Sequence, residues 1–450
     1  MAPLLTFYGD DFTGASAVME VLSFAGLRTM LFLNPPSKAD LAKYPGLQAV
    51  GVAGVARSQN PDWMRANLPP VYRALDQLGA PVLHYKVCST FDSSPEIGSI
   101  GVAAEIGRSI RPSDWNPLVV GAPAMGRFQA FGNLFAAAGT GVFRLDRHPV
   151  MARHPVTPMA EADLGRHLSK QTDLPVGMVT LADMKTGQAD AALTQARADG
   201  ASIVALDAVD EETLAEAGRL IWQDGETPVF ALGSQGVEYA LVAYWQQTGM
   251  LPNDLVPAPF APVDQLFAVS ASVAATTADQ IACAVASGFH FIQFDATAAV
   301  DLGRLDAEFD RVRRASLSAL SEGRDVLVAT ARGPDDPAVA AMSEAITTSG
   351  QAAGAVNDQL GAALGRLVSD IRTKTGLPRI AIAGGDTSGH ALTALGAEAL
   401  SAVAPLAPGG PLCRVHASTS PVIDGLQVAL KGGQIGRPEF FIQTKCGLNT

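Results

Sequence analysis

The segment from Leu4 to Ala15 constrains the fold of this chain more than any other stretch. A short apolar run stops at two adjacent carboxylates, Asp10 and Asp11, and a Thr-Gly pair then opens a segment with helical apolar spacing over residues 15–25. Residues 27–33 follow a glycine and predict the next strand. The pattern predicts a βαβ unit with two acids at the carboxyl end of its first strand, where open α/β sheets keep their ligand crevices.

The acid pair allows two interpretations. Asp11 or Thr13 could serve only as the cap of the helix. Capping accounts for one acid and poorly for two, and carboxylates at a strand end can accept a proton from a hydroxyl, bind a polyol or hold a metal. We therefore favour Asp10 and Asp11 as catalytic residues, and leave open which of them acts as the base.

Strand-like and helical patterns alternate along the chain, which predicts an α/β fold with mostly parallel sheets flanked by helices. The segment 249–262 carries four prolines and predicts a connection between domains. The α/β pattern restarts after it. We expect a first domain over 1–248, a linker over 249–264 and a second domain over 265–450. Residues 146–159 predict an irregular excursion of the first domain.

Composition excludes several classes of partner. The net charge is −12 without a Lys/Arg cluster, so neither nucleic acid nor an anionic membrane is an expected partner. The start of the chain reads as a strand rather than a signal peptide, and no run approaches the roughly 18 apolar residues of a membrane span. The four cysteines are dispersed, which predicts reduced thiols in a cytoplasmic protein and gives no metal-ligand spacing.

Three strand-end loops of the second domain suit a nucleotide. Each combines glycines, hydroxyls or a lysine, which bring backbone N–H groups and positive charge close to phosphate oxygens. An ordinary glycine turn, or a solvated lysine beside a hairpin, is the alternative for any one loop. The three together favour a nucleotide site, and its candidate residues are Ser270, Ser272, Gly384, Gly385, Asp386, Thr387, Ser388, Lys431, Gly432 and Gly433.

The first domain also carries cations and hydroxyls at its predicted strand ends. Lys86 ends one strand and is followed by Ser89 and Thr90, and Arg57 follows another strand. The two cations could hold a carboxylate while the hydroxyls orient a small polar ligand. Alternatively, both long side chains extend into solvent.

Together these segments resemble the four-carbon acid sugar kinase family over nearly the whole chain. The family opens with Asp-Asp-x-Thr-Gly-Ala, as at residues 10–15, and carries Lys-x-Asp-Ser-Thr, as at 86–90. It closes with Gly-Gly-[Asp/Glu]-Thr-Ser-Gly, as at 384–389, and with a Lys-x-Gly-x-Phe-Gly-like end, as at 431–436. The resemblance implies an ATP-dependent kinase with Mg²⁺ that phosphorylates a hydroxyl of a small sugar acid across an interdomain cleft. Threonate, erythronate, 3-oxo-tetronates and the branched 3-oxo-isoapionate are the implied substrate classes.

The chain departs from the family pattern on the acceptor side. Cys88 stands where the family has Asp, and Phe-Asp-Ser-Ser at 91–94 replaces a Leu-Arg-Gly-Asn-like continuation. One carboxylate and one guanidinium are thereby lost, which favours a branched or oxidised relative of a plain tetronate.

Two other functions stay open at this stage. A nicotinamide-dependent oxidoreductase should carry a G-x-G-x-x-G after a strand, and the sequence has none. A non-catalytic sensor of a sugar acid or nucleotide is the second. The oligomeric state, including a homo-oligomer, is also open.

Overall fold

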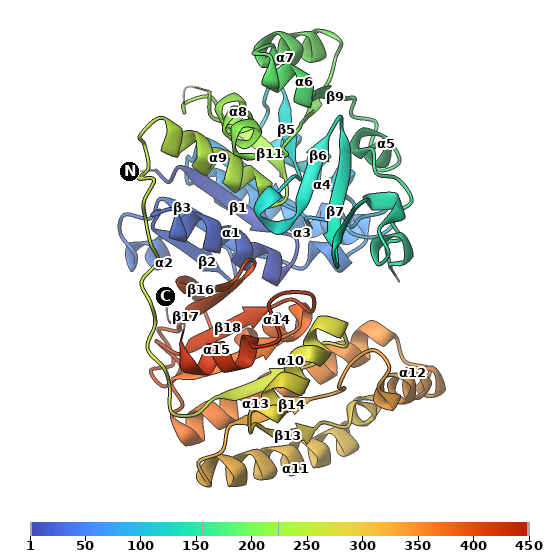
Figure 1. Ribbon diagram of the computed structural model, residues 1–450, viewed down its shortest axis with the longest axis vertical. Coiled ribbons are helices and arrows are strands. Elements are labelled where there is room, and N and C mark those ends of the chain that lie inside the picture. The colour runs from blue at the N-terminus through green and yellow to red at the C-terminus, as the bar shows by residue number, and fades with distance from the viewer. Residues whose placement is uncertain (1, 155, 224, 448–450) are drawn as a thin grey trace. The chain divides into compact units, whose positions relative to one another are not determined.

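The computed structural model describes residues 2–154, 156–223 and 225–447, and for Asp386 its backbone alone. The chain divides into two compact units, one up to Leu255 and one from Val256 onward (Figure 1). Each unit is an α/β structure in which most strands run parallel, and the α/β class is the one that the sequence predicts.

The first unit is built on eight parallel strands in the order β2-β3-β1-β4-β11-β5-β10-β9. Their central strands are buried on both faces, which explains why they read as continuous apolar runs. The strands are β1 (Leu5–Gly9), β2 (Thr29–Phe32), β3 (Ala49–Ala53), β4 (Val82–Lys86), β5 (Asn116–Val119), β9 (Val176–Val179), β10 (Ile203–Leu206) and β11 (Val229–Gly233).

Helices connect these strands. The helix predicted over 15–25 is α1 (Phe12–Phe24), whose N-cap is Asp11. The other helices of this unit are α2 (Lys38–Ala42), α3 (Pro61–Asp76), α4 (Ile100–Ile110), α5 (Leu164–Leu168), α6 (Leu181–Lys185), α7 (Ala189–Ala198), α8 (Glu211–Trp222) and α9 (Gly236–Gln247).

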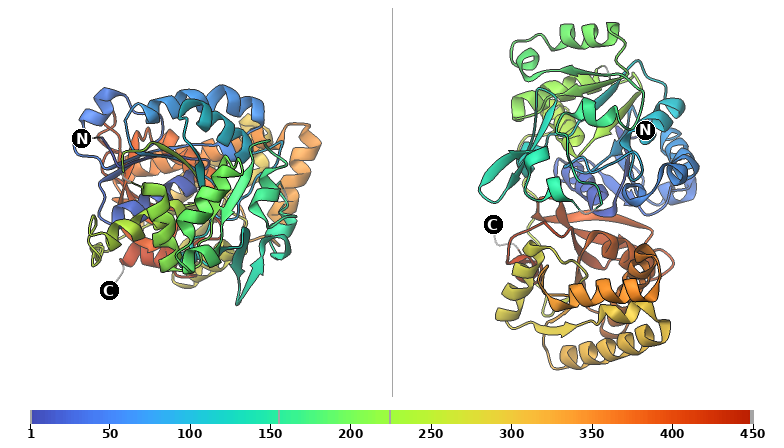
Figure 2. Two further views of the ribbon diagram at one scale, coloured as in Figure 1. Left: turned by 90° about the horizontal axis from the view of Figure 1, so that it is seen from above. Right: turned by 90° about the vertical axis from the view of Figure 1, so that its right-hand side faces the viewer.

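A small antiparallel sheet extends from the first unit and was not predicted from the sequence (Figure 2). It consists of β6 (Arg127–Ala130), β7 (Asn133–Ala138) and β8 (Gly141–Arg144). The turn between β6 and β7 has positive φ at Phe131 and Gly132, and both backbone N–H groups donate to the buried Asp207 carboxylate. Short 3₁₀ turns then occupy part of the predicted irregular excursion at 146–159.

The second unit has seven strands in the order β13-β14-β12-β15-β18-β17-β16. The first five run parallel, whereas β17 pairs antiparallel with both of its neighbours. That antiparallel hairpin was not predicted. The strands are β12 (Phe267–Ser270), β13 (His290–Gln293), β14 (Val326–Ala329), β15 (Arg379–Ala383), β16 (Ala399–Ala407), β17 (Gly410–His416) and β18 (Gln427–Lys431).

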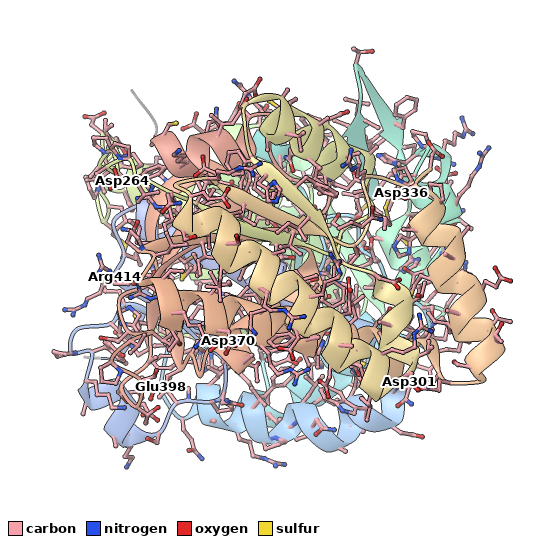
Figure 3. The ribbon with its side chains drawn as sticks, turned by 90° about the horizontal axis from the view of Figure 1, so that it is seen from below. Asp264, Asp301, Asp336, Asp370, Glu398 and Arg414 are labelled. Carbon is pink, nitrogen blue, oxygen red and sulfur yellow. The ribbon has the colours of Figure 1, made fainter. Side chains whose placement is uncertain are left out.

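Six helices are described in this unit. Asp301 and Asp336 cap the N-termini of two of them, α11 and α12, and Figure 3 shows both aspartates at those helix ends. The helices are α10 (Ala275–Ala286), α11 (Leu302–Ser321), α12 (Pro337–Ser349), α13 (Ala353–Thr375), α14 (Gly385–Ala394) and α15 (Phe440–Cys446).

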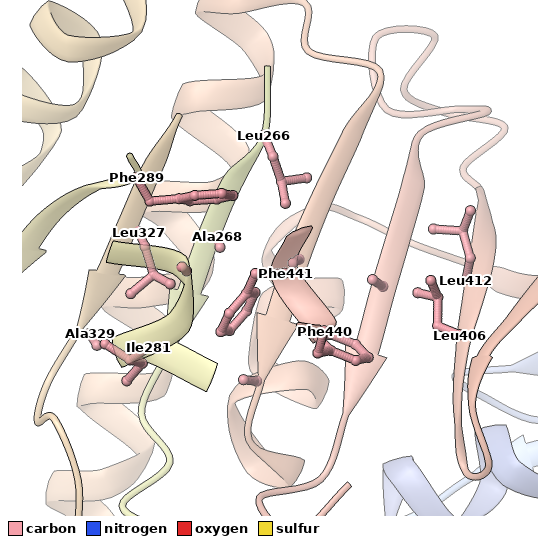
Figure 4. Close-up of a cluster of buried hydrophobic side chains, with 14 of the residues drawn as sticks. Leu266, Ala268, Ile281, Phe289, Leu327, Ala329, Leu406, Leu412, Phe440 and Phe441 are labelled. Atoms are coloured by element: carbon pink, nitrogen blue, oxygen red, sulfur yellow. The ribbon is translucent and has the colours of Figure 1, made fainter. Parts of the chain in front are cut away.

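One part of the hydrophobic core of the second unit is a cluster between the sheet and helices α10 and α15 (Figure 4). Phe440 and Phe441 of α15 pack there with Leu266, Leu327 and Leu412 from the strands or their flanks. This packing fixes the strand ends that carry the predicted nucleotide loops. Within the described part of the chain, no helix is long and apolar enough to cross a bilayer.

Candidate active site

The predicted sugar-acid residues of the first unit gather at the carboxyl ends of three neighbouring strands. β1 lies between β3 and β4, and Gly9 pairs in register with Ala53 and with Lys86. The backbone N–H of Asp10 donates to the Lys86 carbonyl at 2.9 Å, and that of Arg57 donates to the Asp10 carbonyl at 2.9 Å. Strand order therefore brings together three segments that are far apart in the sequence.

Arg57 bridges the acid pair. Its Nε and Nη2 donate to the two oxygens of Asp10 at 3.1 and 2.6 Å, and Nη2 also donates to Asp11 Oδ1 at 2.7 Å. We had expected Arg57 to hold the carboxylate of a ligand, but in the structure its guanidinium lies against the protein's own acids. The bridge keeps two like charges side by side.

The two acids differ in environment. Asp10 is 2 % exposed, and burial raises the pKa of its carboxyl despite the adjacent guanidinium. Burial also acts to raise the pKa of Asp11, but Arg57, Lys86 and hydrogen bonds from Thr13 and Gly14 outweigh it and lower that pKa. Asp11 is the more exposed of the two, with 20 % of its side chain accessible. It caps α1 as well, so the capping and functional interpretations both apply to it.

Lys86 is the unpaired cation of this site. It is 3 % exposed, and no ion pair joins it to any carboxylate in the described ranges. A methyl group on Gly14 would lie 2.3 Å from Lys86 Nζ and 2.3 Å from Asp11 Oδ1. Only glycine therefore lets the start of α1 approach the lysine so closely.

Hydroxyls follow Lys86 as predicted. Ser89 is half-buried and Thr90 is buried. Thr90 Oγ1 donates to Asp92 Oδ1 at 2.5 Å and lies 3.0 Å from the Cys88 thiol. Burial raises the pKa of Cys88, with Asp92 adding to the shift, so the thiol is protonated at neutral pH.

The predicted nucleotide loops of the second unit also share one sheet edge. β15 lies between β12 and β18, and Ala383 pairs in register with Ser270 and with Lys431. The N–H of Gly384 donates to the Lys431 carbonyl at 2.9 Å, and the Ser388 hydroxyl donates to the Gly384 carbonyl at 2.7 Å.

Thr277, at the start of α10, joins two of these loops and was not predicted as a site residue. Lys431 Nζ donates to its hydroxyl at 2.9 Å, the hydroxyl donates to the Gly433 carbonyl at 2.9 Å, and Ser272 Oγ lies 3.0 Å away. The sequence feature that could have identified Thr277 as a site residue is a pair of threonines directly after a loop of small residues.

Lys431 is fully buried rather than solvated. Burial lowers the pKa of its ammonium group to about 7. No salt bridge joins it to a carboxylate within the described residues, so an anionic ligand would supply the missing charge. Phe440 lies beneath it, with the ring centre 5.8 Å from Nζ.

The remaining nucleotide candidates lie at the start of α14. Gly384 has φ of +126°, and a methyl group there would lie 2.9 Å from Thr387 Oγ1. Gly385 begins the helix, and Thr387 and Ser388 are buried in its first turn. The side chain of Asp386 lies outside the described residues. Gly432 follows β18 directly, before Gly433.

The first unit of this α/β protein thus holds buried charged groups at the carboxyl ends of β1, β3 and β4. The second unit holds glycine- and hydroxyl-rich loops and a buried lysine at the carboxyl ends of β12, β15 and β18. Residues 5–241 match a model described as "Sugar-binding N-terminal domain", and residues 267–441 match one described as "Nucleotide-binding C-terminal domain". A 3-oxo-isoapionate kinase from Paraburkholderia graminis is 45 % identical over 97 % of this chain and 93 % of its own length. A 3-oxo-tetronate kinase from Methylobacterium radiotolerans is 31 % identical over 98 % of both chains.

The chain belongs to the four-carbon acid sugar kinase family, and its class is that of a sugar-acid kinase with a nucleotide-binding domain. This removes the oxidoreductase alternative. Two crystal structures support the fold alone, because each is 22 % identical to this chain. A Salmonella typhimurium LT2 protein, provisionally described as a tRNA synthase, has a TM-score of 0.76 over 98 % of both chains, and a Haemophilus influenzae protein has 0.70 over 98 % of both.

Proposed function

We propose that this kinase transfers the γ-phosphoryl group of ATP to a hydroxyl of a branched or oxidised four-carbon-type sugar acid, with 3-oxo-isoapionate as the first candidate. The observation that carries the substrate choice is the 45 % identity to a 3-oxo-isoapionate kinase along nearly the full length of both chains. The other similar kinases, at about a third identity or less, are named for 3-oxo-tetronate.

In this proposal Lys86 binds the carboxylate of the sugar acid. Its support is a buried cation that forms no ion pair with a carboxylate among the described residues and that lies against the start of α1, where Gly14 allows the close approach. Arg57 acts as a positioning residue, because its Nε and Nη2 are engaged by Asp10 and Asp11. Ser89 and Thr90 orient the sugar.

Asp11 is the proposed base for the acceptor hydroxyl. It is more exposed than Asp10, whose two oxygens are both bound by Arg57. Phosphoryl transfer depends mainly on alignment and charge neutralisation, so a base with a low pKa is sufficient. The lowered pKa keeps Asp11 ionised and ready to accept the proton at neutral pH.

The loops at Ser270–Ser272, Gly384–Ser388 and Lys431–Gly433 would bind the phosphates of ATP. Backbone N–H groups at the start of α14 and the buried Lys431 ammonium supply the donors and charge that phosphates require. Mg²⁺ in kinases is usually bound by one or two carboxylates together with substrate phosphates, so we propose that it accompanies the nucleotide into this site. Transfer requires the two sites to face one another during the reaction, which is the interdomain active site that the sequence predicts.

We also propose a cytoplasmic location, which the four free cysteines support.

The test is ATP turnover with a panel of four- to six-carbon sugar acids that includes 3-oxo-isoapionate and 3-oxo-tetronate. We expect ADP release that depends on one of these acids and on Mg²⁺, and that Asp11→Asn lowers kcat about 100-fold or more without changing ATP binding. Binding of sugar acid and ATP without turnover would favour the sensor and reject the kinase. Unchanged turnover in Asp11→Asn would reject the assignment of Asp11 as the base.

A further inference from the structure

The segment after Lys86 carries a carboxylate that no role above has used. Asp92 is half-buried, whereas its neighbours Phe91 and Ser93 are buried. The Phe91 ring packs on His167 with centres 5.5 Å apart, and Ser93 Oγ lies 2.9 Å from His167 Nε2. Two anchored neighbours therefore fix the direction of the Asp92 side chain.

The backbone is strained at this point. Phe91 has φ of +58°, a left-handed conformation that bulky residues rarely adopt. The turn folds the chain so that Asp92 Oδ1 lies 2.5 Å from Thr90 Oγ1.

The hydrogen bonds have a fixed direction. A carboxylate only accepts, so the single hydroxyl hydrogen of Thr90 goes to Asp92. The Cys88 thiol, 3.0 Å from Thr90 Oγ1, must then donate to Thr90. Thr90 and Asp92 consequently offer only acceptor lone pairs to a ligand, whereas Lys86 offers only donors.

Arg127 of β6 supplies a nearby positive charge. Its Nη1 is held by the carbonyls of Met125 and Gly126, each at 3.2 Å, and its Nε is buried without a partner among the described residues. Burial lowers the pKa of Arg127, and the negative charge of Asp92 acts against that shift. A carboxylate is thus joined to Cys88 through the Thr90 hydroxyl, although the family's motif carboxylate is lost at position 88 itself.

We propose that Asp92 is a specificity-determining residue that accepts a hydrogen bond from a non-reacting hydroxyl of the sugar acid. The inference rests on the proposed function. The hydrogen bond to Asp92 would orient the substrate, with its carboxylate at Lys86 and its hydroxyl-bearing end at Asp92. A ligand with hydroxyls on a branch meets this requirement, whereas one with a second carboxylate at that end is repelled.

The test is calorimetric binding and steady-state kinetics of Asp92→Asn, with Asp62→Asn on the exposed face of α3 as the matched control. The ligands are the sugar acid with the highest turnover, or the tightest-bound one if none is turned over, and its monodeoxy analogues. We expect Asp92→Asn to raise the Kd and KM for the sugar acid about tenfold or more, with a smaller effect on kcat and none on ATP. Wild type and Asp62→Asn should both bind one monodeoxy analogue about tenfold more weakly than the parent acid. Asp92→Asn should discriminate less between that analogue and the parent, because a neutral amide oxygen is a weaker acceptor than a carboxylate.

An unchanged Kd in Asp92→Asn would overturn the inference, as would weaker binding that still discriminates against every deoxy analogue to the wild-type extent. Thermal unfolding of each variant separates lost recognition from lost folding. Wild type that binds sugar acids without turning them over would remove the proposed kinase reaction, while the Kd comparison would still decide the role of Asp92. Wild type that binds no sugar acid would overturn both.

Discussion

Lys431 shows how a single buried charge can couple nucleotide binding to pH. Its ammonium group is fully buried, touches the hydroxyl of Thr277 and has a pKa lowered to about 7 by burial. Since triphosphate binding needs the charged form, the site should take up a proton when the nucleotide binds near and above neutral pH.

We expect ATP affinity to fall about tenfold for each pH unit above pH 7, measured by calorimetry in buffers of different ionisation enthalpy. Lys431→Met should bind ATP more weakly and lose this pH dependence. Equal pH profiles in the two proteins would show that Lys431 does not contact the phosphates.

The Lys431 ammonium group also makes the stability of the protein depend on pH, and this dependence has the opposite sign to that of ATP affinity. The folded pKa, about 7, lies below the ordinary value of 10.5, so between these pH values the unfolded state binds more protons. The free energy of unfolding of the ligand-free protein should therefore rise with pH across that window, measured by urea unfolding. In Lys431→Met the rise should be smaller.

A variant of Arg57 can show whether this residue positions the two acids or binds the ligand carboxylate. Removing its guanidinium would leave the Asp10 and Asp11 carboxylates adjacent and without their bridge. We expect Arg57→Gln to lower the free energy of unfolding by about 3–5 kcal/mol, measured in denaturant. A variant of wild-type stability with only a raised KM for sugar acid would support the original expectation that Arg57 binds the ligand carboxylate.

At the scale of an element, the approach of α1 to β4 depends on one glycine. Gly14→Ala would place a methyl group on Lys86 Nζ and on the Asp11 carboxylate. We expect a KM for sugar acid raised about tenfold or more, with ATP affinity unchanged, because the lysine must move. Gly354→Ala in α13 is the control, since a methyl group there meets nothing within 4 Å. Kinetics like those of the control would mean that Lys86 adjusts without loss.

In the second unit, the turn from β15 into α14 likewise requires a glycine, at position 384. Gly384 combines φ of +126° with a close approach to Thr387, so Gly384→Ala would be strained and would crowd the loop. We expect a loss of about 1–3 kcal/mol in the free energy of unfolding and weaker ATP binding, measured by denaturation and calorimetry. Tight ATP binding in that variant would place the phosphates elsewhere.

At the scale of the whole molecule, the chain divides into two compact units, and the second unit has a hydrophobic core built from its own residues. Phe441 is fully buried in that core. Phe441→Ala should destabilise the second unit by about 3–5 kcal/mol and weaken ATP binding, while the sugar-acid Kd at 10 °C stays near wild type. Phe441→Leu is the milder control. A parallel loss of sugar-acid affinity would show that the two units do not bind their ligands separately.

The sequence by itself determined the α/β class and the family, and it predicted the segments that carry the candidate sites. These features are local: a strand, its terminal polar residues and the following helix are contiguous in the chain, as at residues 5–24 and 379–394. The antiparallel pairs β6–β8 and β16–β17 escaped prediction, because short, half-buried strands with many small residues give a weak periodic pattern.

Only the tertiary structure decided which side chains meet. Arg57 binds Asp10 and Asp11 because β1 lies between β3 and β4, and Thr277 reaches Lys431 because α10 starts beside β18's last residue. The turn at Phe91 likewise returns a carboxylate to the neighbourhood of Cys88. Strand order and backbone strain are set by the packing of distant segments, so no local pattern of residues could specify these contacts.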